Sequence, residues 1–232
     1  MKHDSSLHQG HVLKRFDEDM RKLQKRVLKM GRLVQEQMDG LRDVLDQNDE
    51  ERAEQIIEGD RPIDLLEVKV DKFIVRLLAR RSPVGGDLRF IVTASRIVTD
   101  LERLGDETAQ MAKVLVSEYD NLGMCNERSS LEETREMMQL LRQLLERTMD
   151  AFRCQDNRFA RDLAEGNAAA SVELEKRLQG MMSCITQEGA DVSHAVNLVL
   201  ILRSLDRGLR YVQNIGEHVV YLVTGKDVRH RK

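Results

Sequence analysis

The amino-acid sequence predicts an all-α protein made of two tandem antiparallel three-helix bundles. Three observations support this fold class: a helix-favouring composition, apolar residues that recur at helical spacing, and a pattern of helices and turns that occurs twice. Of the 232 residues, 41% are hydrophobic and 33% are charged, whereas only two are proline and none is tryptophan. Long, aliphatic and proline-poor chains of this kind are typical of helix bundles.

The first helix of the first bundle is predicted from an apolar stripe. Its members are separated by steps of three and four residues, the spacing of one helix face: Leu23, Val27, Met30, Val34, Met38, Leu41 and Leu45. We expect this bundle to span residues 12–120 and the polar segment 1–11 to be a flexible tail.

A second helix is expected from about residue 49 to 80, and it contains Pro62. Because proline cannot donate to the carbonyl of Glu58, the helix should either kink there or restart with Asp60 as its N-cap. The turn "RRSPVGG" then precedes a third helix, which Asp87 is expected to cap.

The same pattern begins again after a predicted linker at 121–130. The segment "RTMDAFRCQDNRFARDLAEGN" aligns with "DGLRDVLDQNDERAEQIIEGD" when small shifts are allowed, and both end on Glu-Gly followed by Asp or Asn. This internal repeat predicts a second three-helix bundle at 131–225, followed by a basic tail at 226–232.

Charge and hydropathy narrow the class of protein. The net charge of −3 does not indicate a general nucleic-acid-binding surface. The N-terminus lacks the apolar core of a signal peptide, and no apolar run approaches the roughly 18 residues of a membrane span. We therefore expect a soluble, cytoplasmic protein.

Two pairs of carboxylates, Asp60/Asp64 and Glu102/Asp106, are the candidate functional residues. Their spacing alone is weak evidence, because the 40 acidic residues produce such pairs by chance almost as often. However, Glu102/Asp106 lies in an otherwise apolar helix, and Asp60/Asp64 lies at a similar distance on the other side of the turn. In an antiparallel hairpin the two pairs should face each other, and they would repel unless cations neutralised them.

Two kinds of cation can neutralise such a cluster. Oxygen-only ligands suit hard metal ions such as Mg²⁺, Mn²⁺, Ca²⁺ or Fe. The alternative is local pairing with Arg61, Arg96 and Arg103. The sequence contains no Glu-x-x-His pair of a di-iron bundle, no G-x-S-x-G, no Walker lysine loop and no H-E-x-x-H. We therefore expect a protein that is not an enzyme.

Several segments together resemble the PhoU family of bacterial phosphate-regulation proteins. They are "IIEGD", "PIDLLE", "RRSPVGGDLR", "DLERLGD" and "NIGEHVVYLVTGKDVRH", and the resemblance extends over about residues 12–230. It implies a homodimeric cytoplasmic regulator that links the phosphate ABC transporter ATPase to its sensor histidine kinase. Such a regulator restrains phosphate uptake and the phosphate-starvation response when phosphate is plentiful.

The resemblance also implies a metal site in each bundle, with acids four residues apart on two helices. In the first bundle all four positions match, at Asp60, Asp64, Glu102 and Asp106. In the second bundle the corresponding residues are degenerate and are not expected to bind metal: Asn167, Ser171, Asp206 and Arg210. We thus expect one metal site per chain, for Mg, Mn, Fe or Zn. The alternative function is a metal-dependent enzyme, or a metal- or phosphate-binding protein, that uses the first-bundle carboxylates.

Overall fold

The computed structural model describes residues 5–47, 49–117, 127–156 and 192–226, together with residues 169, 172–173, 175–177 and 179–180. Its long helices are α1 (Ser5–Gln47), α2 (Glu50–Arg81), α3 (Gly85–Ser117), α4 (Glu127–Cys154) and α6 (Val192–Thr224). These described residues contain no strand, so the all-α class is confirmed. None of the described helices is both long and apolar enough to cross a membrane.

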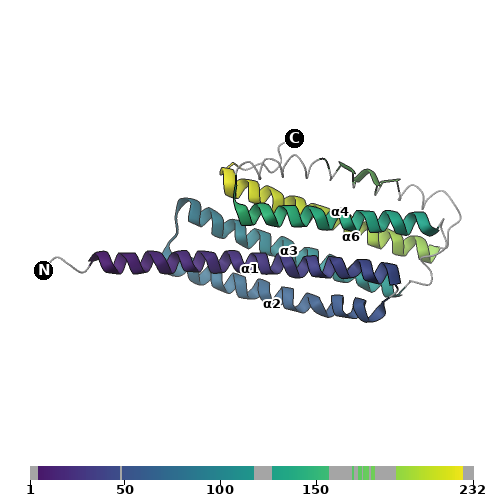
Figure 1. Ribbon diagram of the computed structural model, residues 1–232, viewed down its shortest axis with the longest axis horizontal. Coiled ribbons are helices and arrows are strands. Elements are labelled where there is room, and N and C mark those ends of the chain that lie inside the picture. The colour runs from purple at the N-terminus through teal and green to yellow at the C-terminus, as the bar shows by residue number, and fades with distance from the viewer. Residues whose placement is uncertain are drawn as a thin grey trace.

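The helices lie side by side in an elongated assembly (Figure 1). Helices α1, α2 and α3 all pack on one another, α4 packs on α1, and α6 packs on α3 and α4. The pairs α1/α2, α2/α3, α1/α4 and α3/α6 are antiparallel. For example, Glu107 and Asp100 of α3 contact Arg207 and His218 of α6, in reversed order along the chain.

A single hydrophobic core runs through all five long helices. Every residue of the predicted apolar stripe of α1 is buried, with at most 5% of its surface exposed. The core also joins the two halves of the chain, because Phe90 of α3 stacks on Phe152 of α4 with ring centroids 5.8 Å apart. Helix α6 approaches closely at Gly208, where a Cβ atom would lie 2.9 Å from Leu141 Cδ2 and 3.1 Å from Leu104 Cδ1.

The helix ends correct several boundaries predicted from the sequence. Helix α1 begins at Ser5 and not after a tail of 11 residues, because the polar N-terminal segment contains no proline to stop it. Helix α4 begins at Glu127, inside the predicted linker 121–130. Helix α3 begins at Gly85, so that Asp87 lies in its first turn and is not its cap.

Helix α2 is continuous through Pro62, so the predicted restart at Asp60 is wrong. Proline removes one backbone hydrogen bond, but the buried side chains of Ile56 and Ile63 anchor the helix to the core on both sides of it. At its start, the carboxylate of Asp49 accepts a hydrogen bond of 2.9 Å from the backbone N–H of Arg52, an N-cap. The helix ends at Ser82, whose φ of 44° is left-handed.

The helical hairpin of α2 and α3 is the part of the fold that positions the candidate site. The first three-helix unit, α1 to α3, is fully visible within the described ranges. Most of residues 157–191 and all of 227–232 lie outside those ranges. The division into bundles at 12–120 and 131–225, and the basic tail at 226–232, therefore stay predictions.

Candidate metal centre

Three carboxylates meet where α2 packs on α3. Asp60 and Asp64 are four residues apart on α2 and so lie on one helix face, which is turned towards Asp106 of α3. One oxygen from each of the three side chains lies within 4.8 Å of the others. The antiparallel hairpin thus brings together three of the four predicted residues.

Glu102, the fourth predicted residue, stands outside this group but belongs to the same electrostatic environment. It lies one turn before Asp106 on α3. Partial burial raises the pKa of Glu102, and the negative charges of Asp106, Glu67, Asp64 and Asp60 add to this effect, so that the pKa reaches about 7. A carboxyl with this pKa is partly protonated at neutral pH, which indicates that negative charge prevails around it.

Glu67 of α2 is a further acidic residue beside Glu102, and sequence reasoning did not select it. Its Oε1 accepts a hydrogen bond of 3.3 Å from the hydroxyl of Thr99. Burial raises the pKa of Glu67, with smaller contributions from the charges of neighbouring acids. Its position three residues after Asp64 places it on the same helix face, and this spacing was the available signal.

Asp60 is the most constrained carboxylate of the group. Burial, followed by the charges of Asp106 and Asp64, raises its pKa to about 6. Its Oδ1 atom is buried and has no hydrogen-bond partner among the described residues. A buried oxygen without a donor is costly, so this atom is available to a ligand that supplies positive charge.

Gln37 of α1 faces the same space and was also missed. Its Nε2 donates a hydrogen bond of 3.1 Å to the carbonyl of Ile56, which fixes the amide group. Its Oε1 is buried and, like Asp60 Oδ1, has no hydrogen-bond partner within the described part of the chain. A polar residue next to the apolar stripe of α1 was the sequence signal that could have revealed it.

Gly105 makes room for this convergence of three helices. A Cβ atom at this position would lie 3.2 Å from Ile63 Cδ1, 3.3 Å from Asp60 Oδ1 and 3.4 Å from Gln37 Oε1. Most side-chain atoms do not tolerate such close contacts. Glycine therefore allows α3 to approach both Asp60 on α2 and Gln37 on α1.

The alternative of neutralisation by Arg61, Arg96 and Arg103 finds no support in the geometry. Arg103 pairs with Asp100 at 3.8 Å, on another face of α3. In the described ranges, none of the three arginines lies within salt-bridge distance of Asp60, Asp64, Glu102 or Asp106. The charge of Lys113 lowers the pKa of Asp60, but no described cation forms an ion pair with these carboxylates. Oxygen donors at this density are the donor set that hard cations prefer. The residues present therefore fit a metal ion.

The second copy of the motif has different chemistry on α6. The guanidinium of Arg210 is paired with the carboxylate of Asp206, one turn away. A salt bridge thus replaces the two acids of α3. The other two positions, Asn167 and Ser171, lie outside the described residues. The prediction that this copy binds no metal stays a prediction.

Comparison with known proteins places the fold and the site in a family context. Residues 27–115, which include all four predicted carboxylates, match the PhoU domain. The chain is 32% identical over 230 residues to a phosphate-specific transport system accessory protein PhoU homolog from Pseudomonas aeruginosa, and this match covers 98% of the chain and 92% of the relative. It is 24% identical over 220 residues to PhoU from Escherichia coli K12, covering 95% of the chain and 90% of the relative.

Solved structures agree with these sequence matches. The crystal structure of PhoU from Pseudomonas aeruginosa superposes with a TM-score of 0.81 and 30% identity, over 91% of this chain and all of the other. PhoU from Streptococcus pneumoniae gives a TM-score of 0.78 and 27% identity, over 92% of this chain and 99% of that one. These homologues support an accessory, regulatory role in phosphate transport and not an enzymatic one. Similarity along nearly the whole length shows that the chain belongs to the PhoU family.

Proposed function

We propose that this protein is a cytoplasmic adaptor between the phosphate ABC transporter ATPase and the sensor histidine kinase of the phosphate response. In this role it restrains phosphate uptake and the starvation response when phosphate is plentiful. The observation that carries the proposal is the 32% identity, over 98% of the chain, to a relative named as an accessory protein of phosphate-specific transport.

An adaptor needs an exposed surface for its partners, and α2 offers one. Three large hydrophobic side chains of α2 are exposed: Leu65 by 49%, Val68 by 45% and Val75 by 65%. Exposed basic residues lie on the same side of α2, so that the whole set covers about one third of the helix circumference. We call this set the basic–apolar face of α2, made of Leu65, Val68, Lys69, Lys72, Val75 and Arg76.

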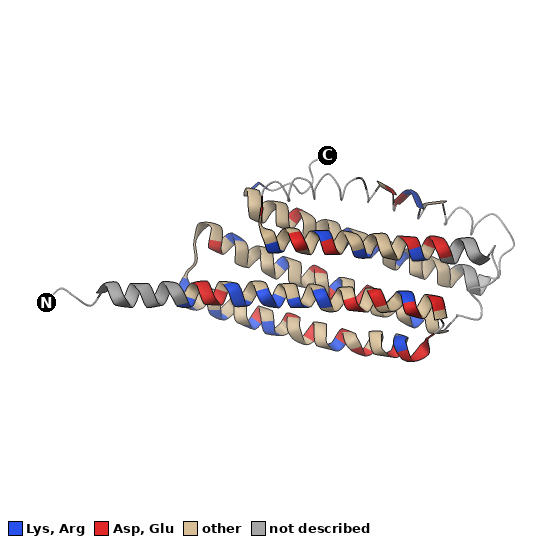
Figure 2. Ribbon diagram, viewed as in Figure 1, with Lys and Arg blue, Asp and Glu red and all other residues tan. Residues whose placement is uncertain are grey.

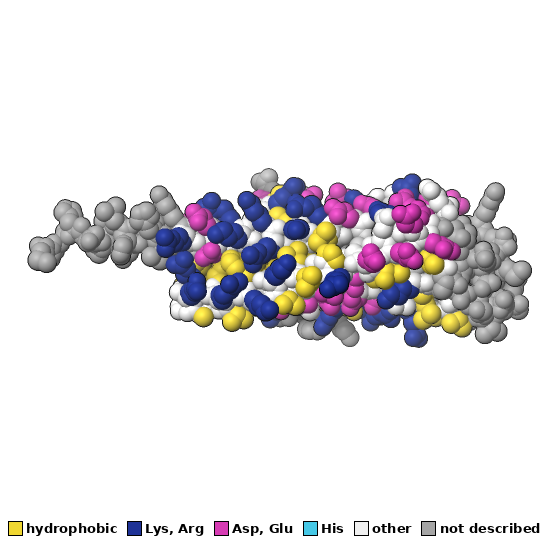
Figure 3. Space-filling view, turned by 90° about the horizontal axis from the view of Figure 1, so that it is seen from below, with side chains coloured by type: hydrophobic (Ala, Val, Ile, Leu, Met, Phe, Trp, Pro, Cys, Tyr) yellow, Lys and Arg dark blue, Asp and Glu magenta, His cyan; other side chains and the backbone are white. Residues whose placement is uncertain are grey.

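Charge on this side of the molecule is segregated. Figure 3 shows basic side chains, with hydrophobic ones among them, over one half and acidic side chains over much of the other. In Figure 2 the described part of α1 is also richer in Lys and Arg towards its N-terminal end. Such a surface favours a partner whose contact region is acidic and apolar, because complementary charge speeds association and fixes orientation.

A pull-down with the purified ATPase and the kinase tests the adaptor role. Wild-type protein should retain both partners, whereas the double variant Lys72→Glu with Val75→Asp should lose at least one of them. The control is Glu54→Gln, a single change at an exposed acid near the start of α2, eleven residues before Leu65. Retention of neither partner by wild type would contradict the adaptor role, and equal retention by the double variant would contradict the assignment of the surface.

Regulation is tested in a bacterium from which the gene has been deleted. Deletion should raise phosphate uptake and switch on the starvation response in phosphate-rich medium, and the intact gene should restore repression. Unchanged uptake and response in the deletion strain would contradict negative regulation.

We also propose that the protein is a homodimer. Light scattering after gel filtration tests this directly, and a monomer at all concentrations would rule it out.

We propose further that Asp60, Asp64, Glu102 and Asp106 hold a metal ion of the Mg, Mn, Fe or Zn group. The support is the partnerless buried oxygen of Asp60 within a cluster of carboxylates. Inside such a cluster, a cation would neutralise the repulsion and fix the packing of α2 on α3. Gln37 Oε1 is positioned to add an amide oxygen or to accept from metal-bound water.

Metal analysis of purified protein tests this site. Wild type should carry stoichiometric metal, and Glu102→Ala with Asp106→Ala should carry none. The matched control is Glu50→Gln with Glu54→Gln, an exposed acid pair at the same spacing on α2. Absence of metal from wild type, together with no gain in stability on adding Mg²⁺, Mn²⁺, Fe²⁺ or Zn²⁺, would reject the site.

A further inference from the structure

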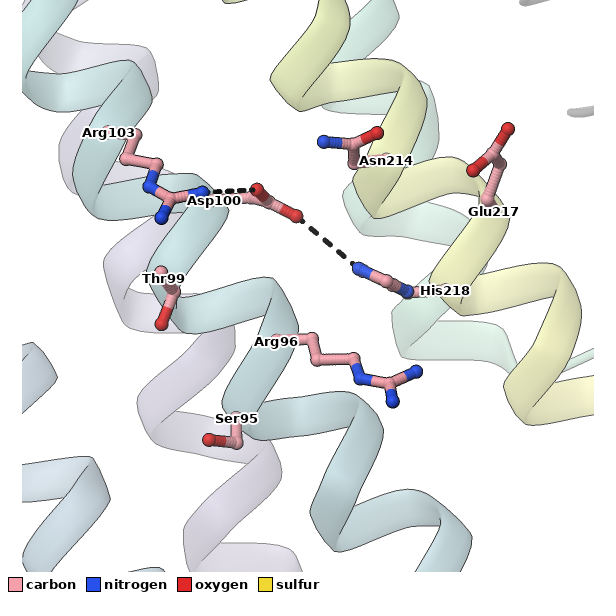
Figure 4. Close-up of a pocket in the computed structure, with 8 residues that line it drawn as sticks. All are labelled: Ser95, Arg96, Thr99, Asp100, Arg103, Asn214, Glu217 and His218. Carbon is pink, nitrogen blue, oxygen red and sulfur yellow. Dashed lines mark ion pairs between the residues drawn. The ribbon is translucent and has the colours of Figure 1, made fainter. Parts of the chain in front are cut away.

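A second polar site lies on the other side of α3, between α3 and α6. It is a cavity of about 600 Å³. Figure 4 shows the side chains that line it, which come from these two helices. Those that carry the argument are Arg96, Asp100 and Arg103 of α3 and Asn214, Glu217 and His218 of α6. None of them belongs to the group of carboxylates between α2 and α3.

The carboxylate of Asp100 in this cavity already has two basic partners. Oδ2 of Asp100 lies 3.4 Å from Nε2 of His218, and Oδ1 lies 3.8 Å from Nη1 of Arg103. The side chains of Asp100 and His218 are only 7% and 10% exposed, so this contact is held inside the helix interface. Asp100 therefore does not compete for the second arginine of the cavity.

Arg96 is the arginine of this cavity that has no counter-charge among the described residues. Its guanidinium extends into the space beside His218 in Figure 4. Although it is half-buried, it makes no hydrogen bond or ion pair with any described residue. Glu217 also has no ion-pair partner in the described part of the chain, and in Figure 4 His218 lies between it and Arg96. The two charged groups thus remain apart at opposite sides of the same cavity.

We propose that this cavity binds the phosphate group of a small phosphorylated metabolite, with Arg96 as its principal ligand. The planar guanidinium presents a fork of N–H donors that match two oxygens of a phosphate. Because Arg96 is unpaired among the described residues, it does not have to break an ion pair within the protein before it binds the phosphate. In Figure 4 the amide of Asn214 lies on the other side of the Asp100–His218 contact, within the lining of the same cavity. This site is separate from the adaptor role and from the metal centre.

Size and the remaining acid indicate which phosphates fit. A volume of about 600 Å³ is within the range of small-molecule pockets and exceeds what one inorganic phosphate fills. Glu217 supplies an acceptor on the far side of His218, where it can accept from a hydroxyl group of the ligand. A sugar phosphate offers both groups, a phosphate for Arg96 and hydroxyls for Glu217.

Titration calorimetry at low salt, with ribose 5-phosphate and inorganic phosphate as separate probes, tests the proposal. Wild type should bind ribose 5-phosphate, and Arg96→Gln should weaken this binding by about tenfold or more, because a charge-assisted bond is lost. The matched control is Arg80→Gln, an exposed arginine at the end of α2 without an ion pair to any described residue. Glu217→Gln should weaken binding of ribose 5-phosphate and leave that of inorganic phosphate unchanged.

The outcomes separate the possible ligands. Binding of inorganic phosphate alone, lost in Arg96→Gln, would retain the oxyanion site and reject the organic ligand. If neither ribose 5-phosphate nor inorganic phosphate bound, or if Arg96→Gln bound them as tightly as wild type, the proposal would be overturned. Circular dichroism checks that the variants are folded. If Arg96→Gln does not fold, Arg96→Lys keeps the charge without the fork, and its affinity should fall between wild type and no binding.

Discussion

Asp60 of α2 and Asp106 of α3 present carboxylate oxygens within 4.8 Å of each other across the helical hairpin. The charge of Asp106 is the largest electrostatic contribution to the raised pKa of Asp60, after burial. The two helices therefore pack tightly in spite of a local repulsion.

The stability of the metal-free protein should fall as the pH rises. The pKa of Asp60 is raised from 3.8 to about 6 and that of Glu102 from 4.5 to about 7. Between these values the folded state holds more protons than the unfolded state, so the stabilisation present at low pH is lost as the pH passes through 6 and 7. We expect a loss of roughly 1–2 kcal/mol for each group after solvent screening.

Urea unfolding in the presence of a chelator, between about pH 5 and pH 8, measures this loss. Asp60→Asn with Glu102→Gln should flatten the profile over this interval, whereas Glu50→Gln with Glu54→Gln should keep the wild-type slope. A wild-type stability that does not fall over this interval would contradict the pKa values of the two groups.

Asp60→Asn should have opposite effects on the metal-free and the metal-loaded protein. Removing one charge relieves the repulsion with Asp106 and Asp64, so the metal-free variant should be more stable than wild type at about pH 8 by roughly 1 kcal/mol. The same change should abolish the gain from added metal, which for a bound ion at 100 times its Kd is about 2.7 kcal/mol. Thermal unfolding with and without Mn²⁺ measures both, and a preserved Mn²⁺ gain would exclude Asp60 as a ligand.

Gly105→Ala should impair the metal site more than the fold. The new methyl group would lie 3.3 Å from Asp60 Oδ1 and 3.4 Å from Gln37 Oε1, so both side chains must shift. The greater helix propensity of alanine, worth up to about 1 kcal/mol, offsets part of the strain. We therefore expect a small change in metal-free stability and a clear loss of the Mn²⁺ gain.

Gly86→Ala is the matched control for this variant, because a Cβ atom there has nothing within 4 Å. It should retain the whole Mn²⁺ gain. If Gly105→Ala also retained the full gain, the close approach at Gly105 would have no role in the site.

The two ion pairs formed by Arg207 and Arg210 of α6 should differ widely in their contribution to the free energy of unfolding. Arg207 binds Glu107 of α3 through two bonds, of 2.5 and 2.6 Å, and the Glu107 side chain is only 13% exposed. Glu107→Gln should therefore cost roughly 1–3 kcal/mol of unfolding free energy. Arg210→Ala breaks an exposed pair within α6 and should cost less than about 0.5 kcal/mol. Equal losses in urea unfolding would contradict this ranking.

The parts of the fold that depend on local pattern could be predicted. The steps of three and four in α1 identified its buried stripe, because a helix has a fixed period. Pro83 and the glycines after it marked the turn between α2 and α3, and the hairpin then implied that Asp60 and Asp106 would face each other. Helix ends were less predictable. Of the two alternatives expected near Pro62, a kink or a restart at Asp60, the restart did not occur, because packing of Ile56 and Ile63 outweighs one lost hydrogen bond.

Features that depend on packing between distant helices could not be predicted. Gln37 reaches the site only because of how α1 is rotated against the hairpin, which its sequence does not specify. The pairs Glu107–Arg207 and Asp100–His218 require the docking of α6 on α3, and neither residue of a pair indicates its partner. For the same reason no pattern indicated the cavity around Arg96.

Helix α3 has the acidic centre on one side and the cavity on the other, and Thr99 belongs to both. Its hydroxyl donates to Glu67 beside the acidic centre, and the residue also lines the cavity. Helix α3 therefore contributes residues to both proposed binding sites. If binding at one site changes the affinity of the other site by some factor, thermodynamic linkage requires that binding at the second site changes the affinity of the first by the same factor. Occupancy of the proposed metal centre and of the proposed phosphate site would then be coupled through α3.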